Sequence, residues 1–222
     1  MVVEEAAENQ LWDVATRFFH WNLVLVLMLL WWSAETARLD LHESAGIYLL
    51  SLLIWRIYLG FFGSKSSKFR EFVLGPGQVG AYLRGLTTSR EGHNPLGGWM
   101  IILMLLTLVV QAVTGLFNSD DVFFYGPLYF VATDGFLGLA GEIHAVMFCI
   151  ILSLAAMHVI AVFWHQTFKK RPLIQAMVLG KSIGRIGLEK PTSQARAFFA
   201  LIVIYLTVNF GLSKAPGPVS FF

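Results

Sequence analysis

Long apolar stretches separated by shorter polar ones dominate the pattern of this 222-residue chain. Five stretches contain at most one Asp, Glu, Lys or Arg: 18–34, 44–62, 96–117, 143–168 and 197–213. The one charged residue among them is Arg56. A helix needs about 20 apolar residues to cross a hydrocarbon core of about 30 Å. The pattern therefore predicts five transmembrane helices, the fifth of them close to the C-terminus.

The composition indicates that lipid is the solvent of this chain. Hydrophobic residues make up 56% of it and charged residues 14%, whereas about a quarter of a soluble globular chain is charged. We therefore expect an all-α integral membrane protein. The N-terminus is acidic, with Glu4, Glu5 and Glu8 ahead of the first apolar stretch. Because a secretory signal begins with basic residues, we expect this stretch to be a retained anchor.

The basic residues alternate from loop to loop, which predicts the orientation of the helices. The second and fourth loops, 63–95 and 169–196, carry twelve Lys and Arg residues, whereas the other loops and the tail carry only Arg38 and Lys214. Positively charged loops stay in the cytoplasm. We therefore expect a cytoplasmic N-terminus and a C-terminus on the outer side. The net charge of +2 does not indicate nucleic-acid binding, because the basic residues follow the topology.

Two loops have apolar patterns of their own. Residues 66–90 mix basic and apolar side chains, which fits a short helix on the inner headgroups, broken at Gly75-Pro76-Gly77. The third loop carries the aromatic clusters Val122-Phe123-Phe124-Tyr125 and Leu128-Tyr129-Phe130. These fit either the bilayer surface or a docking surface for an external partner.

The cysteine content excludes several kinds of redox centre. Cys149 is the only cysteine, so the chain can neither form an internal disulfide nor bind an iron–sulfur cluster by itself. It also lacks the Cys-x-x-Cys-His motif that attaches a c-type haem covalently. We interpret Cys149 as a small core residue.

Histidine is the residue type best placed for cofactor chemistry. There are six: His20, His42, His93, His144, His158 and His165. Ionisable side chains at membrane depth are rare and usually functional, although a lone histidine can also be a hydrogen-bonding residue between helices. His144 and His158 are 14 residues apart, which is about 21 Å along a helix and about 40° around it. The fourth stretch therefore presents one histidine at each of two depths on one face.

The predicted topology supplies a mate at each depth. His42 begins the second stretch on the outer side and can meet His144, whereas His20 begins the first stretch on the inner side and can meet His158. Two such pairs fit the axial positions of two non-covalent b-type haems, because neutral imidazole suits iron. A zinc site would need three or four ligands at one point, and a proton relay would need acids that these stretches lack.

Two arginines are candidate partners of haem propionates. Arg56 follows His42 by 14 residues and therefore faces the same way at the inner level, and Arg17 lies one turn before His20. An arginine at membrane depth is costly unless it is paired, and bidentate hydrogen bonds with a propionate would pair it. The alternative for both residues is extension to the phosphate headgroups.

Three further residues have open roles. His165 lies two turns past His158 on nearly the same face and is a rival ligand closer to the inner headgroups. His93 precedes an expected helix start at Asn94-Pro95. It is either an interfacial side chain or a residue that binds quinone or a propionate. Gly46, one turn after His42, leaves room either for a porphyrin face or for ordinary helix packing.

These residues form an ordered set of motifs over roughly residues 11–180: Trp12-Asp13-x-x-x-Arg17-x-x-His20-Trp21, His42-x-x-x-Gly46, Arg56, Gly92-His93-Asn94-Pro95, and His144 with His158. In this order and spacing the sequence resembles the bacterial di-haem cytochromes b that include the b-type subunits of nickel–iron hydrogenases. It is also similar to the membrane subunits of some formate dehydrogenases. The resemblance implies a four-helix haem core over residues 1–180 with axial ligands His20, His42, His144 and His158. Residues 181–222 with the fifth helix are then a C-terminal extension that only some members share.

The resemblance also implies a function in the bacterial inner membrane. The chain would carry electrons across the bilayer between the quinone pool and a redox partner on the outer face, such as a hydrogenase, a dehydrogenase or a cytochrome c. It would then be an electron-transfer subunit rather than a free-standing enzyme, because the haem carries the redox chemistry.

Two alternatives remain at the sequence level. One is a self-contained oxidoreductase that passes electrons from a small species such as superoxide to quinone, although an outer loop without Lys or Arg does not favour an anion. The other is a transporter or structural membrane protein, which would bind no haem.

Overall fold

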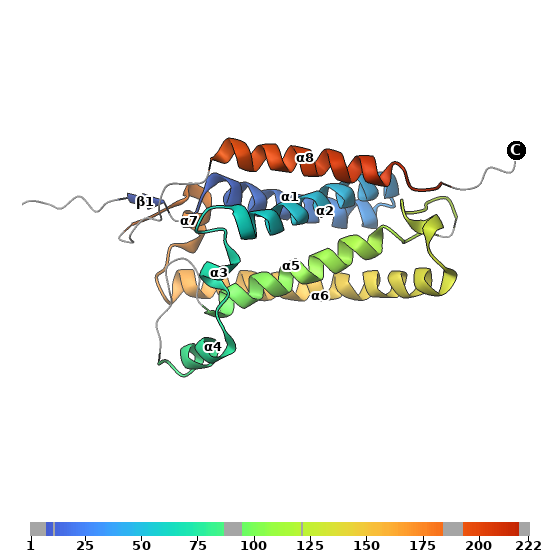
Figure 1. Ribbon diagram of the computed structural model, residues 1–222. Helices are drawn as coiled ribbons and strands as arrows, with labels where there is room; N and C mark the ends of the chain where they lie inside the picture. The colour runs from blue at the N-terminus through green and yellow to red at the C-terminus, as the bar shows by residue number, and fades with distance from the viewer. Residues whose placement is uncertain (1–7, 11, 87–94, 121, 184–192, 218–222) are drawn as a thin grey trace, which may run out of the picture. The chain divides into compact units, whose positions relative to one another are not determined.

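A computed structural model describes residues 8–10, 12–86, 95–120, 122–183 and 193–217 (Figure 1). Helices follow one another along the described chain, from α1 near the N-terminus to α8 near the C-terminus. Among the described residues only two strands occur, each of three residues. The predicted all-α fold is therefore confirmed.

Five helices have the length and composition needed to cross a membrane, as the pattern predicted. They are α1 (Val14–Glu35), α2 (Leu39–Phe62), α5 (Pro95–Gly115), α6 (Asp134–Thr167) and α8 (Gln194–Leu212). The start of α6 differs most from its prediction, because Asp134 and Glu142 interrupt the uncharged run without interrupting the helix. Five apolar helices make this a multi-pass membrane protein.

The length of α6 explains how its first turn can be charged. At 34 residues and about 1.5 Å per residue it is about 51 Å long, whereas the hydrocarbon core is about 30 Å thick. The first turns of α6 can therefore lie outside the apolar layer. His144 comes ten residues after Asp134, about 15 Å along the helix, at the start of the uncharged run 143–168.

The segment between α2 and α5 forms two short helices. α3 (Phe69–Phe72) ends before Gly75, and α4 (Pro76–Leu83) starts at its proline. Proline suits the first turn because its missing N–H needs no acceptor there. The predicted break at Gly75-Pro76-Gly77 is therefore confirmed.

A small two-stranded ribbon was not predicted. β1 (Glu8–Gln10) pairs antiparallel with β2 (Lys181–Ile183), which follows α7 (Leu173–Leu179). A three-residue strand is too short to show the alternation of apolar and polar residues that marks strands in a sequence.

The chain separates into two compact units. The His20 unit comprises Met1–His20, Arg56–Leu103 and Ala155–Phe198, and the His42 unit comprises Trp21–Trp55, Met104–Leu154 and Phe199–Phe222. The predicted pair His20 and His158 falls in the first unit, and the pair His42 and His144 falls in the second. Each candidate site is therefore built within one unit.

The fifth spanning helix, α8, packs against the earlier helices in each unit. In the His20 unit Phe198 meets Phe18 of α1 edge to face, with ring centroids 5.1 Å apart. In the His42 unit Tyr205 meets Tyr48 of α2 at 6.0 Å. Aromatic pairs in this geometry stabilise packing beyond the area they bury. The predicted domain boundary at residue 180 stays a prediction.

Candidate functional site

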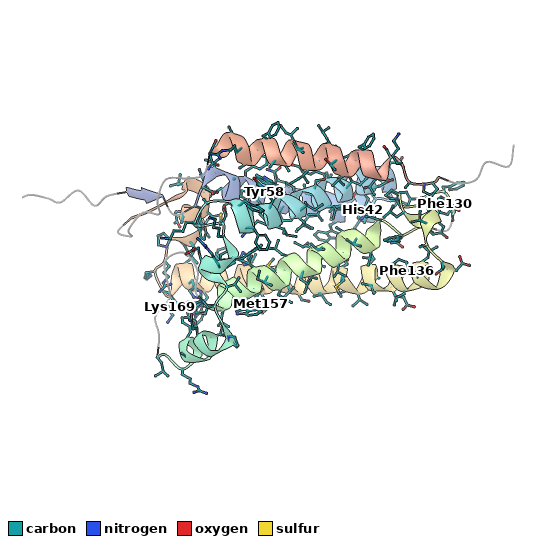
Figure 2. The ribbon with its side chains drawn as sticks, in the orientation of Figure 1. His42, Tyr58, Phe130, Phe136, Met157 and Lys169 are labelled. Carbon is teal, nitrogen blue, oxygen red and sulfur yellow. The ribbon has the colours of Figure 1, made fainter. Side chains whose placement is uncertain are left out.

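His42 and His144 lie beside one another in the His42 unit, although about a hundred residues separate them in sequence. Their ring centroids are 6.4 Å apart and the ring planes are inclined at 73°. His42 lies in the first turn of α2 (labelled in Figure 2), and His144 lies in the third turn of α6. Both side chains are half-buried. The fold thus brings together the two histidines that the topology predicted to meet.

One ring nitrogen of His42 is held by α1. Its Nδ1–H donates to the carbonyl oxygen of Leu30 over 3.0 Å, and because a carbonyl can only accept, the proton must be on Nδ1. The Ser33 hydroxyl lies 3.3 Å from the same nitrogen and donates to the Leu30 carbonyl over 3.1 Å. In this tautomer Nε2 carries a lone pair that can bind a metal.

His144 is held in the same way by α5. Its Nδ1–H donates to the carbonyl oxygen of Gln111 over 3.0 Å, and the Thr114 hydroxyl lies 3.3 Å from this nitrogen. The side-chain amide of Gln111 donates to Nε2 over 3.0 Å. Since only an unprotonated Nε2 can accept this bond, His144 has the same tautomer as His42.

Gly115 permits the close approach of His144 to α5. A Cβ atom at this position would lie 2.9 Å from Cε1 and 3.3 Å from Nδ1 of the His144 ring. Both contacts are shorter than carbon atoms comfortably tolerate. Any larger residue at position 115 would therefore displace the imidazole from the Gln111 carbonyl.

The His42–His144 geometry fits two axial ligands of one haem. A coordinating imidazole nitrogen lies about 2 Å from a first-row metal and the ring centre about 1 Å further, so two opposed axial rings have centres about 6 Å apart. The observed 6.4 Å agrees with this spacing. Metal-binding histidines also commonly donate the other ring N–H to a carbonyl, as both do here. Among the described residues no cluster of three or more His, Cys, Asp or Glu could hold a metal ion, which disfavours a zinc site there.

His20 and His158 come together in the His20 unit. They lie near enough to interact electrostatically, and both are half-buried. His20 is in the second turn of α1, and His158 lies in the second half of α6. The fold is therefore compatible with the second predicted pair.

Arg56 is buried among protein groups. Its exposed fraction is 5%, and its Nη1 donates to the carbonyl oxygen of Ser67 over 3.1 Å. Three ring centres surround its guanidinium carbon at 5.1–5.9 Å: those of Phe19, Phe69 and Phe72. Cation–π contact stabilises such a desolvated charge. This burial does not fit extension to the headgroups, and the propionate contact stays a prediction.

Asp13 anchors the beginning of α1. Its Oδ1 accepts the backbone N–H of Thr16 over 2.6 Å, which caps the helix. Its Oδ2 accepts the hydroxyls of Ser64 and Ser67, the latter over 3.2 Å. Asp13 therefore ties α1 to the loop after α2, and so helps to fix the position of His20 about two turns later.

Arg17 binds the end of α7. Its Nη1 donates to the carbonyl oxygen of Val178 over 2.8 Å. This carbonyl lies in the last turn of α7, where the helix itself supplies no N–H donor. Gly180 follows with a φ of +80°, and a Cβ there would lie 2.9 Å from the Arg17 guanidinium carbon. Both features require glycine at the end of this helix. Arg17 thus has a structural role, and its contact with a propionate stays a prediction.

The remaining predicted residues are distributed as follows. Nδ1–H of His165 donates to the Ala161 carbonyl of its own helix over 2.9 Å. His93 and its neighbours Gly92 and Asn94 lie outside the described residues, while α5 begins at Pro95 as expected. A Cβ atom on Gly46 would meet no atom within 4 Å, so there is open space beside α2 one turn after His42.

Sequence reasoning missed four residues around the His42–His144 pair: Ser33, Gln111, Thr114 and Gly115. A signal for three of them was present, because a polar side chain within an apolar helix usually hydrogen-bonds a neighbouring helix. The signal does not say which neighbour. Gly115 had no distinguishing signal among the 20 glycines of the chain.

Comparison with known proteins identifies a family. A family model described as prokaryotic cytochrome b561 matches residues 11–180, a range that contains all four paired histidines. No curated protein and no solved structure matches the chain.

Proposed function

The chain belongs to the prokaryotic cytochrome b561 family, and on this premise we propose that it carries electrons through two haems b, one near each face of the bilayer. Membership makes it a membrane b-type cytochrome that binds haem b and transfers electrons. The proposal adds the number of haems and their ligands. His42 and His144 hold the outer haem, and His20 and His158 hold the inner one.

The observation that carries the proposal is the geometry of His42 and His144. Two imidazoles with centroids 6.4 Å apart, each with Nδ1–H bound to a carbonyl, offer two Nε2 atoms to one metal. Haem iron leaves two axial positions for such ligands. The His20–His158 pair supports the second haem. His158 follows His144 by 14 residues on α6, so the helix presents a second histidine on nearly the same face at the other depth.

The chain's own residues supply position and environment. Haem iron, when bound, supplies one-electron redox chemistry. The carbonyls of Leu30 and Gln111 hold the imidazoles in one tautomer, and the apolar helices exclude water. The Gln111 amide must turn away from Nε2 of His144 on ligation, because one lone pair cannot serve both a donor and a metal.

The charge pattern supports the orientation that we propose. Loops rich in Lys and Arg lie in the cytoplasm, so the N-terminus is inside and the C-terminus is periplasmic in the bacterial inner membrane. Quinone is the proposed lipid-soluble electron carrier, and a redox protein on the outer face is the proposed second partner. The segment 181–222 then extends the haem core of residues 1–180.

Haem stoichiometry tests the proposal directly. A pyridine haemochrome assay on the detergent-purified chain, with protein quantified independently, should give two haems b per chain. One haem or none in well-folded protein would contradict the assignment of one or both histidine pairs as haem ligands. His165 would then be the first alternative ligand to test.

The alternative of a self-contained oxidoreductase predicts a different result. Purified chain, given superoxide and a quinone analogue without a partner protein, should then reduce the quinone catalytically. The proposed conduit should show no such turnover, while its haems remain reducible by chemical reductants.

A further inference from the structure

The supports of His42 and His144 have the same construction on two different helices. In each, a carbonyl oxygen accepts Nδ1–H at 3.0 Å, and a hydroxyl lies 3.3 Å from Nδ1 and 3.1 Å from that carbonyl. The carbonyl and hydroxyl come from residues three apart, which are Leu30 and Ser33 on α1 and Gln111 and Thr114 on α5. Residues at this spacing share one helix face.

Each hydroxyl is placed to connect two groups. Ser33 Oγ donates to the Leu30 carbonyl, so its lone pairs are directed to accept from Nδ1–H of His42. Thr114 Oγ1 donates to carbonyls of its own helix, at 2.8 Å to Val110 and 3.1 Å to Gln111, and faces His144 in the same way. Each Nδ1–H is therefore shared between a carbonyl and a hydroxyl, which restricts rotation of the ring more than one acceptor would.

We propose that Ser33 and Thr114 are positioning residues of the outer haem, which with the Leu30 and Gln111 carbonyls set the orientation of both axial imidazoles and the reduction potential. This inference rests on the proposed function, because it takes His42 and His144 as the axial ligands. Neither hydroxyl would bind the iron, and each would act through the histidine that it contacts.

Two physical consequences follow from these supports. An imidazole that donates its second N–H becomes a better electron donor to the metal, which stabilises ferric over ferrous haem and lowers the potential. The supports also hold the rings 73° apart. Nearly perpendicular axial imidazoles give ferric low-spin haem a large-g electron paramagnetic resonance (EPR) signal that parallel rings do not give.

The test uses variants of full-length, haem-loaded protein. In Ser33→Ala and Thr114→Val, the outer haem should be retained with an upward shift of its midpoint potential and an altered large-g signal, while the inner haem is unchanged. Thr114→Ser keeps the hydroxyl and should restore both properties. The outer signals are assigned by their loss from His42→Ala.

Ser51→Ala is the matched control. Ser33 and Ser51 both have 0% exposure, and each donates to a carbonyl of its own helix, Ser51 to Ile47 over 3.0 Å. The Ser51 variant loses the same group at the same burial, and it should leave potential and EPR signal unchanged.

The possible results distinguish failure of the positioning role from failure of the proposed haem ligands. The positioning role would be overturned if both hydroxyl variants kept two haems with an unchanged outer potential and EPR signal. It would also be overturned if Ser51→Ala changed these properties equally. Neither outcome would contradict the proposed haem ligands. Two haems that both persist in His42→Ala would overturn the ligand assignment itself. Selective loss of the outer haem from Thr114→Val with its recovery in Thr114→Ser would support the inference.

Discussion

Each histidine of the His42–His144 pair uses its two ring nitrogens for different tasks. Nδ1 is bound to a carbonyl of a neighbouring helix, and Nε2 carries the lone pair for ligation, which in His144 accepts from the Gln111 amide. Substitution of either histidine removes its Nδ1 hydrogen bond and its Nε2 ligand together. On the proposed ligands, the effect of such a substitution should be confined to the haem of that pair.

The histidine variants give the first prediction at this scale. His42→Ala or His144→Ala should remove the outer haem and leave the inner one, which halves the haem content per chain. His20→Ala or His158→Ala should do the reverse, because on the proposed ligands each haem depends on its own pair. Haemochrome assays and redox titration would follow the two centres. Loss of both haems from every folded variant would contradict the pairing.

Gly46 provides a second prediction. Leucine in place of this helical glycine should raise intrinsic helix stability by about 0.8 kcal/mol, and a Cβ there meets no atom within 4 Å. If a porphyrin face occupies this space, Gly46→Leu should nevertheless lose the outer haem selectively. Gly46→Ala is the smaller control and should retain it. A Gly46→Leu protein with two haems at normal potentials would assign the glycine to ordinary helix packing.

The four histidines could be predicted because a fixed helical repeat links their spacing to depth and face. Their supports could not, because they depend on how α1 and α5 are rotated about their own axes. A helix that is apolar on all sides has no amphipathic face to reveal this rotation. Arg56 illustrates the same limit, since its level was predicted from spacing but the three phenylalanines around it come from two separate helices, α1 and α3.

At the scale of elements, uncharged runs predict the bodies of helices better than their ends. The ends depend on local hydrogen bonds, as at the start of α1, where Asp13 accepts from Thr16 and from the loop after α2. They also depend on helices that continue through charged residues, as α6 does at Glu142. The strands β1 and β2 are too short, at three residues each, for their pairing to show as an alternation of apolar and polar residues in the sequence.

The cap at Asp13 gives the third prediction. Asp13→Ala should destabilise the protein by about 1 kcal/mol for the lost cap and by roughly 1–3 kcal/mol for buried hydroxyls left without an acceptor. Thermal unfolding in detergent would measure the change. Asp40→Ala is the control, because Asp40 is an exposed acid in the first turn of α2. Equal melting temperatures for the two variants would show that the Asp13 network contributes little.

The loop between α5 and α6 gives a prediction of pH dependence. The Asp120 carboxylate accepts the backbone N–H groups of Phe124, Phe123 and Val122 at 2.7, 2.9 and 3.0 Å. These bonds, that of Phe124 foremost, hold the pKa of Asp120 below its ordinary value. A lowered pKa means that the carboxylate stabilises the folded loop fully above the ordinary aspartate pKa of about 3.9. This stabilisation is lost as the pH falls through the lower value of the folded loop.

Hydrogen exchange of the three amides would measure this dependence. Their protection factors should be constant above about pH 5 and fall as the carboxylate protonates. The Asp120→Asn variant, which has no carboxylate to titrate, should show weaker protection with no such fall. A pH-independent protection in the unaltered protein would contradict the assigned role.

At the scale of the whole molecule, composition determines the class of protein and charge determines the predicted orientation. Neither depends on side-chain packing, which is why both can be read from the sequence. The identity of the proposed redox partner depends on the surface of another protein, so this chain constrains it only through the acidic and aromatic residues of the loop between α5 and α6.

Orientation gives the fifth prediction. In a Cys149→Ala background, Phe123→Cys should react with a membrane-impermeant maleimide applied outside intact spheroplasts, and Gln78→Cys should react only after lysis. Phe123 is 91% exposed and Gln78 is exposed in α4, so access would not limit either reaction. The reverse pattern would place the N-terminus in the periplasm.

The supports of the His42–His144 pair also bear on biogenesis. Within the His42 unit the two rings come from α2 and α6, and their carbonyl supports come from α1 and α5. Ribosomes deliver these helices in order, so α1, α2 and α5 leave the ribosome before the part of α6 that carries His144. On the proposed ligands, cofactor capture at this site is therefore a late event that requires four helices to have been inserted correctly. Haem retention would then report on correct membrane assembly, and a chain with a misinserted helix could be recognised by its failure to keep the cofactor.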